Sequence, residues 1–167
     1  MRKAEYLIVL PIESMPLHTG YEQGKSLPLH CTLMHWFSLD MRYSRARLWE
    51  EVQQVCAQHM YVTGCPGRIE LVSEACDLFG PNNDVPVHTL RRNDVLLTLH
   101  TRLLMLLTLA YSWPPALHWV GAGYRPHVST VEGRSFPPGT KHIATRLALV
   151  ERTSDRVKRI IGRYSLQ

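Results

Sequence analysis

The chain has 167 residues, of which 45% are hydrophobic and 20% are charged, and its formal net charge at pH 7 is +5. This composition is typical of a folded globular protein, excludes a chain that is disordered throughout, and fits a single domain over residues 1–167. The basic balance favours polyanionic or phosphate-bearing partners, although it does not indicate a dedicated DNA-binding protein.

The first half of the chain predicts strands and one helix. The helix is capped by Asp40 or Ser44 and runs to about His59, because apolar residues recur on one face at helical spacing. The extended segments are rich in β-branched and aromatic residues and are bounded by turn-forming residues. They are a strand at 6–12, a loop through Pro28, a strand at 29–37, a loop at 61–67, and one strand or a strand pair at 68–79.

The second half predicts a similar mixture. A second helix is capped by Asn93 or Asp94 and stops before Trp113-Pro114-Pro115, because proline disfavours helix in the residue before it. The extended segments are a short strand at 85–91, a strand at 124–131, a loop at 132–140, and two strands at 142–152 and 157–166 that form a hairpin around residues 153–155.

The order of these elements predicts an α+β fold in which most strands are antiparallel. Each half of the chain contains one helix and several strands, so we expect two similar lobes without a detectable sequence repeat. The sequence contains no glycine-rich phosphate loop and no nucleophile elbow, which leaves nucleotide hydrolysis on a glycine cradle without support.

Three further features bear on location. The four cysteines have neither CxxC pairing nor metal-ligand spacing. The apolar run near the N-terminus is short and is soon followed by Glu13, which argues against a signal peptide. The longest apolar stretch, 95–113, is interrupted by polar residues, so a buried amphipathic helix fits it better than a membrane span. We therefore expect a cytoplasmic protein without a membrane partner.

Two of the nine histidines stand in the pattern His-x-Ser/Thr, namely His30-Cys31-Thr32 and His127-Val128-Ser129. Nine histidines would produce about one such match by chance, so the pattern alone is weak. Its context is more informative, because each match lies in a predicted strand, in a different half of the chain, and follows a segment that contains a proline.

Residues i and i+2 of a strand point to the same face. His30 and Thr32 therefore share one face of their strand, while Cys31 points into the core. In the same way His127 and Ser129 share a face in front of a buried Val128. If the two lobes pack about a pseudo-twofold axis, two imidazoles and two hydroxyls converge on one cleft.

This set of groups suits the cleavage of a phosphodiester. One imidazole takes the proton of the incoming nucleophile and the other donates a proton to the leaving oxygen, since histidine titrates near neutral pH. The hydroxyls donate hydrogen bonds to the phosphoryl oxygens as negative charge builds up. Such a scheme needs no metal ion or other cofactor, and no carboxylate cluster is placed to bind one.

The segments LPLHCTL (27–33) and YRPHVST (124–130) resemble the two signature motifs of the two-histidine (2H) phosphoesterase superfamily, which includes bacterial 2'-5' RNA ligases and 2',3'-cyclic phosphodiesterases. The resemblance covers essentially the whole chain. It implies a bilobal α+β fold with helices outside and a central cleft, and it gives catalytic roles to His30, Thr32, His127 and Ser129. The second motif of the family usually has threonine at the position of Ser129. We expect a monomer that acts on RNA or nucleotide substrates.

Four more residues are candidates for substrate binding. Arg125 shares the strand parity of His127 and could reach a phosphate, although a solvent-facing role is as plausible from the sequence. Trp36 and Tyr124 could stack on a base, but packing in the core or at its rim is the commoner role of such residues. Arg134 lies where many members of the family place a basic residue after the second motif.

Two alternatives remain open at this point. The basic balance and the unusual residues Cys31 and Met34 in the first motif also fit a non-catalytic RNA-binding or nucleotide-binding module on the same fold. A histidine metal site is the weaker alternative, because such sites usually add a third close ligand.

Overall fold

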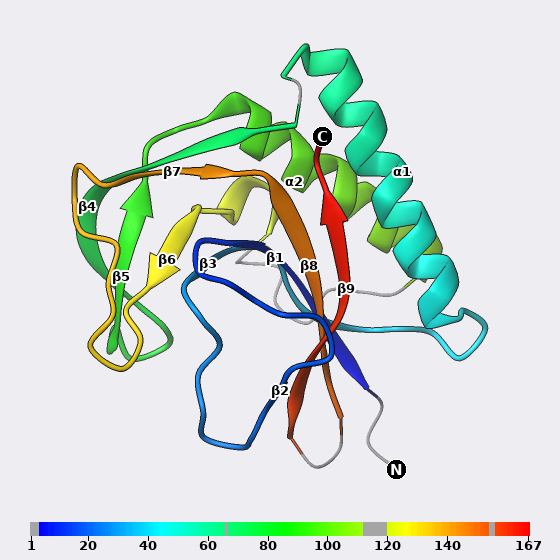
Figure 1. Ribbon diagram of the computed structural model, residues 1–167, viewed down its shortest axis with the longest axis horizontal. Helices are drawn as coiled ribbons and strands as arrows, with labels where there is room; N and C mark the ends of the chain where they lie inside the picture. The colour runs from blue at the N-terminus through cyan, green and yellow to red at the C-terminus, as the bar shows by residue number, and fades with distance from the viewer. Residues whose placement is uncertain (1–3, 66, 112–119, 154–155) are drawn as a thin grey trace.

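The computed structural model describes residues 4–65, 67–111, 120–153 and 156–167 and consists of a large sheet with two main helices (Figure 1). The helices are α1 (Arg45–Thr63) and α2 (Asp94–Leu106), and α2 is followed by a π-helical turn at Leu107–Tyr111. The strands are β1 (Glu5–Pro11), β2 (Gly20–Tyr21), β3 (His30–Ser38), β4 (Ile69–Phe79), β5 (Val85–Leu90), β6 (His127–Ser129), β7 (Lys141–Ala144), β8 (Arg146–Arg152) and β9 (Lys158–Ser165).

The strands form one sheet in the order β2-β9-β8-β1-β3-β6-β5-β4-β7, and every pair is antiparallel. The first five strands of this order form one half of the sheet and the last four form the other. The two halves meet where β3 pairs with β6. The prediction of an α+β fold built mainly from antiparallel strands is confirmed.

Both faces of the sheet are covered near β1, so this strand is buried on each side. Its alternate residues belong to two different hydrophobic clusters, one with Ile8 and one with Val9. The larger cluster includes the inner faces of α1 and α2. The smaller cluster lies on the opposite face and includes Met15 and Leu27, from the segment between β1 and β3. The helices therefore cover one face of the sheet, and this segment covers part of the other.

The helix ends follow local capping chemistry. Ser44 caps α1 by accepting a hydrogen bond from the amide of Arg47 at 3.2 Å, and Gly64 ends it in the left-handed conformation at φ 63°. The helix thus continues through Thr63, so the prediction of a loop from residue 61 was wrong for its first three residues. Asn93 caps α2 as predicted. The predicted stop before Trp113-Pro114-Pro115 lies outside the described residues.

Three strand predictions need correction. The strand predicted at 124–131 is only His127–Ser129, because Pro126 has no N–H to donate and a tight turn begins at Val131. The strand predicted at 142–152 breaks at Thr145, where the chain crosses from β7, which pairs with β4, to β8, which pairs with β1 and β9. Strand β2 lies in the segment predicted to be a loop. The β8–β9 hairpin is confirmed by its pairing.

No helix in the part of the chain that the structure describes has both the length and the apolar character needed to cross a membrane.

Candidate active site

The two His-x-Ser/Thr segments lie side by side where the halves of the sheet meet. Cys31 on β3 pairs with Val128 on β6 in an antiparallel register. Continuing this register by one residue in each direction brings His30 opposite Ser129, and Thr32 opposite His127. Each histidine of one segment therefore faces the hydroxyl residue of the other segment.

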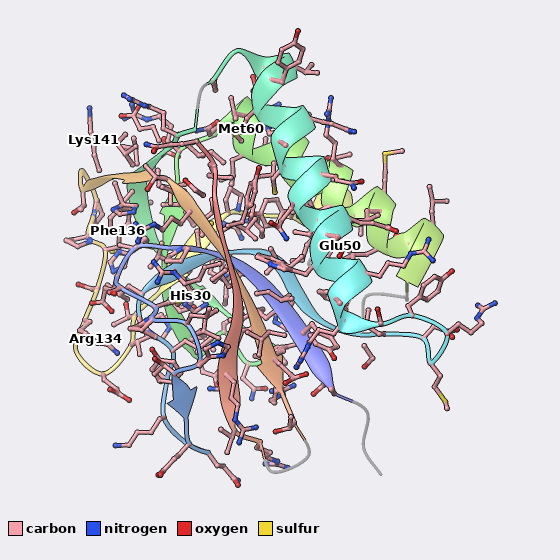
Figure 2. All side chains as sticks on the ribbon, turned by 45° about the vertical axis from the view of Figure 1, so that its right-hand side comes forward. His30, Glu50, Met60, Arg134, Phe136 and Lys141 are labelled. Carbon is pink, nitrogen blue, oxygen red and sulfur yellow. The ribbon has the colours of Figure 1, made fainter. Side chains whose placement is uncertain are left out.

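All four of these side chains are on the same face of the sheet. Cys31 and Val128 are 0% exposed and belong to the cluster beneath the helices, so their neighbours in sequence point to the opposite face. His30 and His127 occupy diagonal positions across the strand pair, which places them roughly 7–8 Å apart. This separation is suitable for two imidazoles on either side of one phosphate group. In Figure 2, His30 and Arg134 lie in the part of the molecule away from α1.

Matching backbone hydrogen bonds orient the two imidazoles. Nδ1 of His30 lies 2.6 Å from the carbonyl oxygen of Pro28, and Nδ1 of His127 lies 2.8 Å from the carbonyl oxygen of Arg125. A carbonyl oxygen accepts only, so each Nδ1 carries a proton and donates it. In both rings Nε2 is then the nitrogen that can exchange a proton with a ligand. The two bonds span the same two-residue offset, so the local geometry repeats in both motifs.

The pKa values of both histidines are lowered from 6.5, and burial is the main cause in each case. The carbonyl hydrogen bonds act in the opposite direction because they stabilise the imidazolium. The positive charges of His127 and Lys158 lower the pKa of His30 further, and Arg125 does the same for His127. A bound phosphate would counteract these effects, since its negative charge favours a protonated imidazole.

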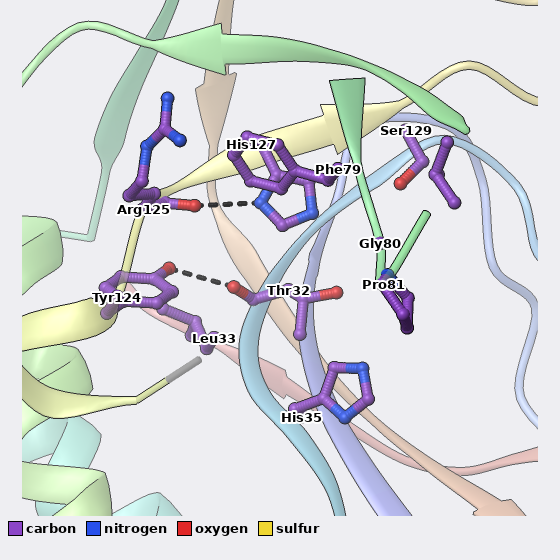
Figure 3. A pocket seen from close by; sticks show the side chains of 11 residues that line it. Thr32, Leu33, His35, Phe79, Gly80, Pro81, Tyr124, Arg125, His127 and Ser129 are labelled. Carbon is purple, nitrogen blue, oxygen red and sulfur yellow. Dashed lines mark hydrogen bonds between the residues drawn. The ribbon is translucent and has the colours of Figure 1, made fainter. Parts of the chain in front are cut away.

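A pocket of about 380 Å³ opens beside His127 (Figure 3). His127, Thr32 and Ser129 form its polar wall. His30 lies next to this pocket but does not line it. The remaining wall is largely apolar and contains Leu33, His35, Phe79, Gly80, Pro81, Val85, Tyr124 and Arg125.

Phe79 packs against both His127 and Arg125. The ring of Phe79 is tilted by 60° to that of His127, with centroids 4.6 Å apart, and the guanidinium of Arg125 lies 4.6 Å from the centroid of Phe79. Arg125 also forms an ion pair of 2.6 Å with Asp77. The hydrogen bond from Arg125 lowers the pKa of this carboxyl group. Arg125 therefore lines the pocket, and its charge is already paired with a carboxylate.

Tyr124, from the second motif, is bonded to the backbone of the first motif. Its hydroxyl donates a hydrogen bond to the carbonyl oxygen of Thr32 at 2.8 Å (Figure 3). Its ring stacks on His100 with centroids 3.7 Å apart and an interplanar angle of 7°. His100 is 2% exposed, donates from Nδ1 to the carbonyl oxygen of Leu33 at 2.7 Å, and accepts from the amide of Gly121 at 2.9 Å. Tyr124 and His100 thus tie β3 to the segment that leads into β6.

Trp36 lies on the same face of β3 as Thr32 but not in this pocket. The β1–β3 register contains two irregularities, and each adds one residue to β3. Each one reverses the alternation of side chains along β3, so the two together leave Trp36 on the face that alternation from Thr32 predicts. The indole packs against the smaller hydrophobic cluster, and the guanidinium of Arg152 lies 4.3 Å from its ring. One face of Trp36 is therefore already in contact with a protein cation.

Arg134 reaches the first motif through an acidic residue that sequence analysis did not identify. It forms an ion pair of 2.5 Å with Glu13, whose carboxylate also accepts a hydrogen bond of 2.8 Å from the amide of Leu29. Leu29 immediately precedes His30. Arg134 is thus linked through Glu13 to the backbone of the residue before His30. A second ion pair joins Arg134 to a carboxylate oxygen of Glu132 at 3.7 Å.

The residues of the site that were not predicted include Phe79, His100 and Glu13. Each lies far from both motifs in sequence, and no local pattern marks any of them as a partner of the histidines. Among the described residues, no group of three or more histidine, cysteine, aspartate or glutamate side chains is arranged to hold a metal ion.

The comparisons with known proteins match the fold. No protein-family model matches the sequence, and no curated protein matches it either. A crystal structure of a phosphoesterase superposes with a TM-score of 0.58 at 13% identity and covers 98% of both chains. E. coli LigT complexed with 3'-AMP superposes with a TM-score of 0.59 at 14% identity, over 99% of both chains.

The chain shares the fold of that phosphoesterase and of E. coli LigT. A second structure of E. coli LigT, complexed with phosphate, gives a TM-score of 0.55 at 13% identity and covers 99% of both chains. At these identities the likeness to the solved structures establishes the fold alone, and the chemistry has to be argued from this chain's own residues.

Proposed function

We propose that this protein is a metal-independent phosphoesterase that acts on RNA ends or nucleotides, with His30, Thr32, His127 and Ser129 as its catalytic residues. The reaction is the opening of a 2',3'-cyclic phosphate, or the cleavage and reverse formation of a 2'-5' phosphodiester. The observation that supports it most strongly is the Cys31–Val128 pairing, around which two imidazoles and two hydroxyls share one face.

The two histidines divide the proton transfers. In hydrolysis, Nε2 of the neutral imidazole accepts a proton from water as the water oxygen bonds to phosphorus. Nε2 of the protonated imidazole donates its proton to the ribose oxygen as the bond from that oxygen to phosphorus breaks. The reaction consumes one water and leaves the two imidazoles with exchanged protonation states, which solvent then resets.

Thr32 and Ser129 act on the phosphoryl group itself. Each lies opposite a histidine in the β3–β6 register, so each hydroxyl is on the same face of the sheet as the two rings. Hydrogen bonds from these hydroxyls stabilise the negative charge that builds up on the non-bridging oxygens during attack. Protein donors held by strands need little reorganisation at that moment, which is why such donors lower the barrier.

The pocket beside His127 is suited to a nucleobase. Leu33, Phe79 and Tyr124 contribute apolar or aromatic wall, and the volume of about 380 Å³ is of the size expected for a small ligand. E. coli LigT, which has the same fold, has been crystallised with 3'-AMP and with ATP. The nucleotide complexes of that protein are consistent with a nucleotide substrate here.

Turnover in the presence of EDTA tests this proposal. Purified protein is given 2',3'-cyclic nucleotides and 2'-5'-linked oligonucleotides, and product is measured for the wild type, His30→Ala and His127→Ala. We expect turnover by the wild type and a loss of at least about 10²–10⁴-fold in each variant. His88→Ala is the matched control, because His88 pairs with Val128 and so lies on the other face of the sheet.

Two results would reject the enzyme. One is the absence of turnover by the wild type on both substrate classes. The other is turnover that persists equally in His30→Ala and His127→Ala. If RNA binding were unchanged by the histidine substitutions and no product formed, the protein would be a binding module on this fold.

A further inference from the structure

Three of the hollows that are lined by described residues lie along the site face of the sheet, and they differ in charge. The pocket beside His127 is largely apolar. A second hollow of about 480 Å³ contains Lys25 and Arg134 but also the carboxylates of Glu22 and Glu132. The third, of about 210 Å³, lies between the 11–15 segment and the β7–β8 corner, and its titratable side chains are Glu13, His142, Arg146 and Arg163. We call this third hollow the arginine hollow.

Sheet register places Arg163 on the same face as the catalytic hydroxyl of Thr32. Val9 pairs with Thr32 on one side and with Ala148 on the other, and Ala148 pairs with Arg163. Directly opposed residues of an antiparallel sheet project to the same side. Three strand spacings of about 4.8 Å separate the two residues, so Arg163 lies roughly 14 Å from Thr32.

Arg146 is aligned with His30 across the sheet, as Arg163 is aligned with Thr32. Pro11 pairs with His30, and the β1–β8 register continued by two residues beyond Val9 brings Arg146 opposite Pro11. Two strand spacings place Arg146 roughly 10 Å from His30 on the same face. The arginine hollow therefore begins one strand away from a catalytic histidine.

The two arginines of this hollow have no ion-pair partner among the described residues. Both are exposed. The carboxylate of Glu13 lines the hollow, but it is engaged by Arg134 at 2.5 Å and by the amide of Leu29 at 2.8 Å. Arg134, by contrast, is paired with both of its acidic neighbours. The arginine hollow thus has an uncompensated positive charge.

We propose that the arginine hollow binds backbone phosphates of a single-stranded RNA whose terminal phosphate is held between His30 and His127. The inference rests on the proposed function and specifies its substrate class as an oligonucleotide end. RNA is required because a 2',3'-cyclic phosphate or a 2'-5' bond needs a 2'-hydroxyl. The terminal base occupies the apolar pocket, and the carboxylates of the second hollow repel phosphate, so the strand continues over Pro11 toward Arg146 and Arg163.

This route has a kinetic consequence. A mononucleotide contacts the histidines and the base pocket only, whereas an oligonucleotide also gains the phosphate contacts. We therefore expect a lower KM for an oligonucleotide with a 2',3'-cyclic end than for the cyclic mononucleotide, with similar kcat. The added affinity is electrostatic and decreases as the salt concentration rises.

The test compares Arg146→Glu/Arg163→Glu with a control of equal charge change, Arg68→Glu/Arg91→Glu. Arg68 and Arg91 are also exposed, and neither lines any of the three hollows. KM and kcat are measured on a 2',3'-cyclic mononucleotide and on a ten-nucleotide RNA with the same end. Arg146→Gln/Arg163→Gln is measured in parallel, so that loss of charge is separated from charge reversal.

We expect the Glu variant of the hollow to raise the KM of the RNA at least tenfold and to leave the mononucleotide constants unchanged. The dependence of log KM on log salt should become less steep by about 1.4, which corresponds to two lost phosphate contacts on a single strand. In the control Arg68→Glu/Arg91→Glu, the KM of the RNA should change less than twofold. Equal effects in both double variants, or equal effects on both substrates, would overturn the proposal.

A binding measurement distinguishes a failure of this proposal from a failure of the proposed function. Fluorescence anisotropy of the same RNA, with a DNA of the same sequence and polyglutamate as competitors, needs no turnover. If the wild type were inactive but its RNA affinity still fell in the hollow variant alone, the proposed function would fail and the hollow would stand as an RNA site. If polyglutamate displaced RNA at equal charge concentration, the hollow would bind acidic polymers generally and the proposal would be wrong.

Discussion

Cys31 and Val128 pair directly across the line where the two halves of the sheet meet, and both side chains are fully buried. This single pair fixes the positions of its four neighbours, because alternation along each strand sends all of them to the opposite face. Burial raises the pKa of the Cys31 thiol to about 12, so it stays protonated and apolar beneath the site. The Cys31–Val128 pair therefore positions the four side chains that we propose to be catalytic.

The hydroxyls of Thr32 and Ser129 are expected to contribute to kcat rather than to KM. Thr32→Val and Ser129→Ala each remove one donor to the phosphoryl oxygens without adding bulk. We expect each to lower kcat by about 10²–10³-fold, as the loss of an oxyanion donor does elsewhere. Steady-state kinetics on a 2',3'-cyclic nucleotide measures this. Thr32→Ser keeps the hydroxyl and should retain most of the activity, and an inactive Thr32→Ser would argue against the role.

Tyr124→Phe should lower both stability and activity. The substitution removes the hydroxyl that donates to the carbonyl oxygen of Thr32, which then keeps only the weak contact from the Cys31 thiol at 3.9 Å, and the loss costs about 0.5–1.5 kcal/mol. Burial raises the pKa of Tyr124 well above 10, so the hydroxyl remains a donor throughout the neutral range. Because Thr32 is then less firmly held, kcat should fall while KM changes little.

Tyr6→Phe is the control for this experiment. The hydroxyl of Tyr6 donates to Glu151 at 3.3 Å, away from the pocket. The Tyr6→Phe substitution should lower the urea midpoint of unfolding without changing kcat. If the two tyrosine variants lost kcat in proportion to their loss of stability, the link between Tyr124 and Thr32 would have no specific role in turnover.

Folding stability should decrease as the pH falls below about 6.5. His59 and His100 are 0% and 2% exposed, and burial lowers the pKa of both. Well above pH 6.5 these groups are neutral in both the folded and the unfolded state, so stability is at its full value there. Between 6.5 and the lowered folded pKa, the unfolded state binds more protons, and the free energy of unfolding decreases.

Urea unfolding at pH 7.5, 6.5 and 5.5 measures this dependence. His59 is the more informative position, because its Nε2 donates to the carbonyl oxygen of Val95 at 2.8 Å while its buried Nδ1 has no partner. His59→Leu should weaken the pH dependence of the midpoint, since it removes one of the buried titrating groups. A midpoint that is unchanged or higher at pH 5.5 would contradict this account.

Local sequence rules predict the part of the site that depends on strand alternation. The face shared by His30 and Thr32, and that shared by His127 and Ser129, follow from parity. Helix caps are equally local, and Ser44 and Asn93 cap as expected. The short β6 follows less directly, because its end is set by the turn at Val131 as well as by Pro126.

Contacts between distant segments are not encoded in such patterns. The stacking of His100 on Tyr124 joins α2 to the second motif, and it depends on where the helix packs against the sheet. The predicted face of Trp36 is correct only because two irregularities in β3 offset one another. The contact of that indole with Arg152 depends on the placement of β8, which no spacing within β3 reveals.

The pH dependence of kcat/KM tests the central claim most directly. We measure it with EDTA present on a 2',3'-cyclic nucleotide, for the wild type and for the residual activities of His30→Ala and His127→Ala. The account predicts a bell-shaped wild-type profile centred below pH 6.5, because burial lowers the pKa of both free histidines, and each variant should lose one limb of the bell. A profile without a bell, or one that keeps both limbs in either variant, would contradict acid–base catalysis by this pair.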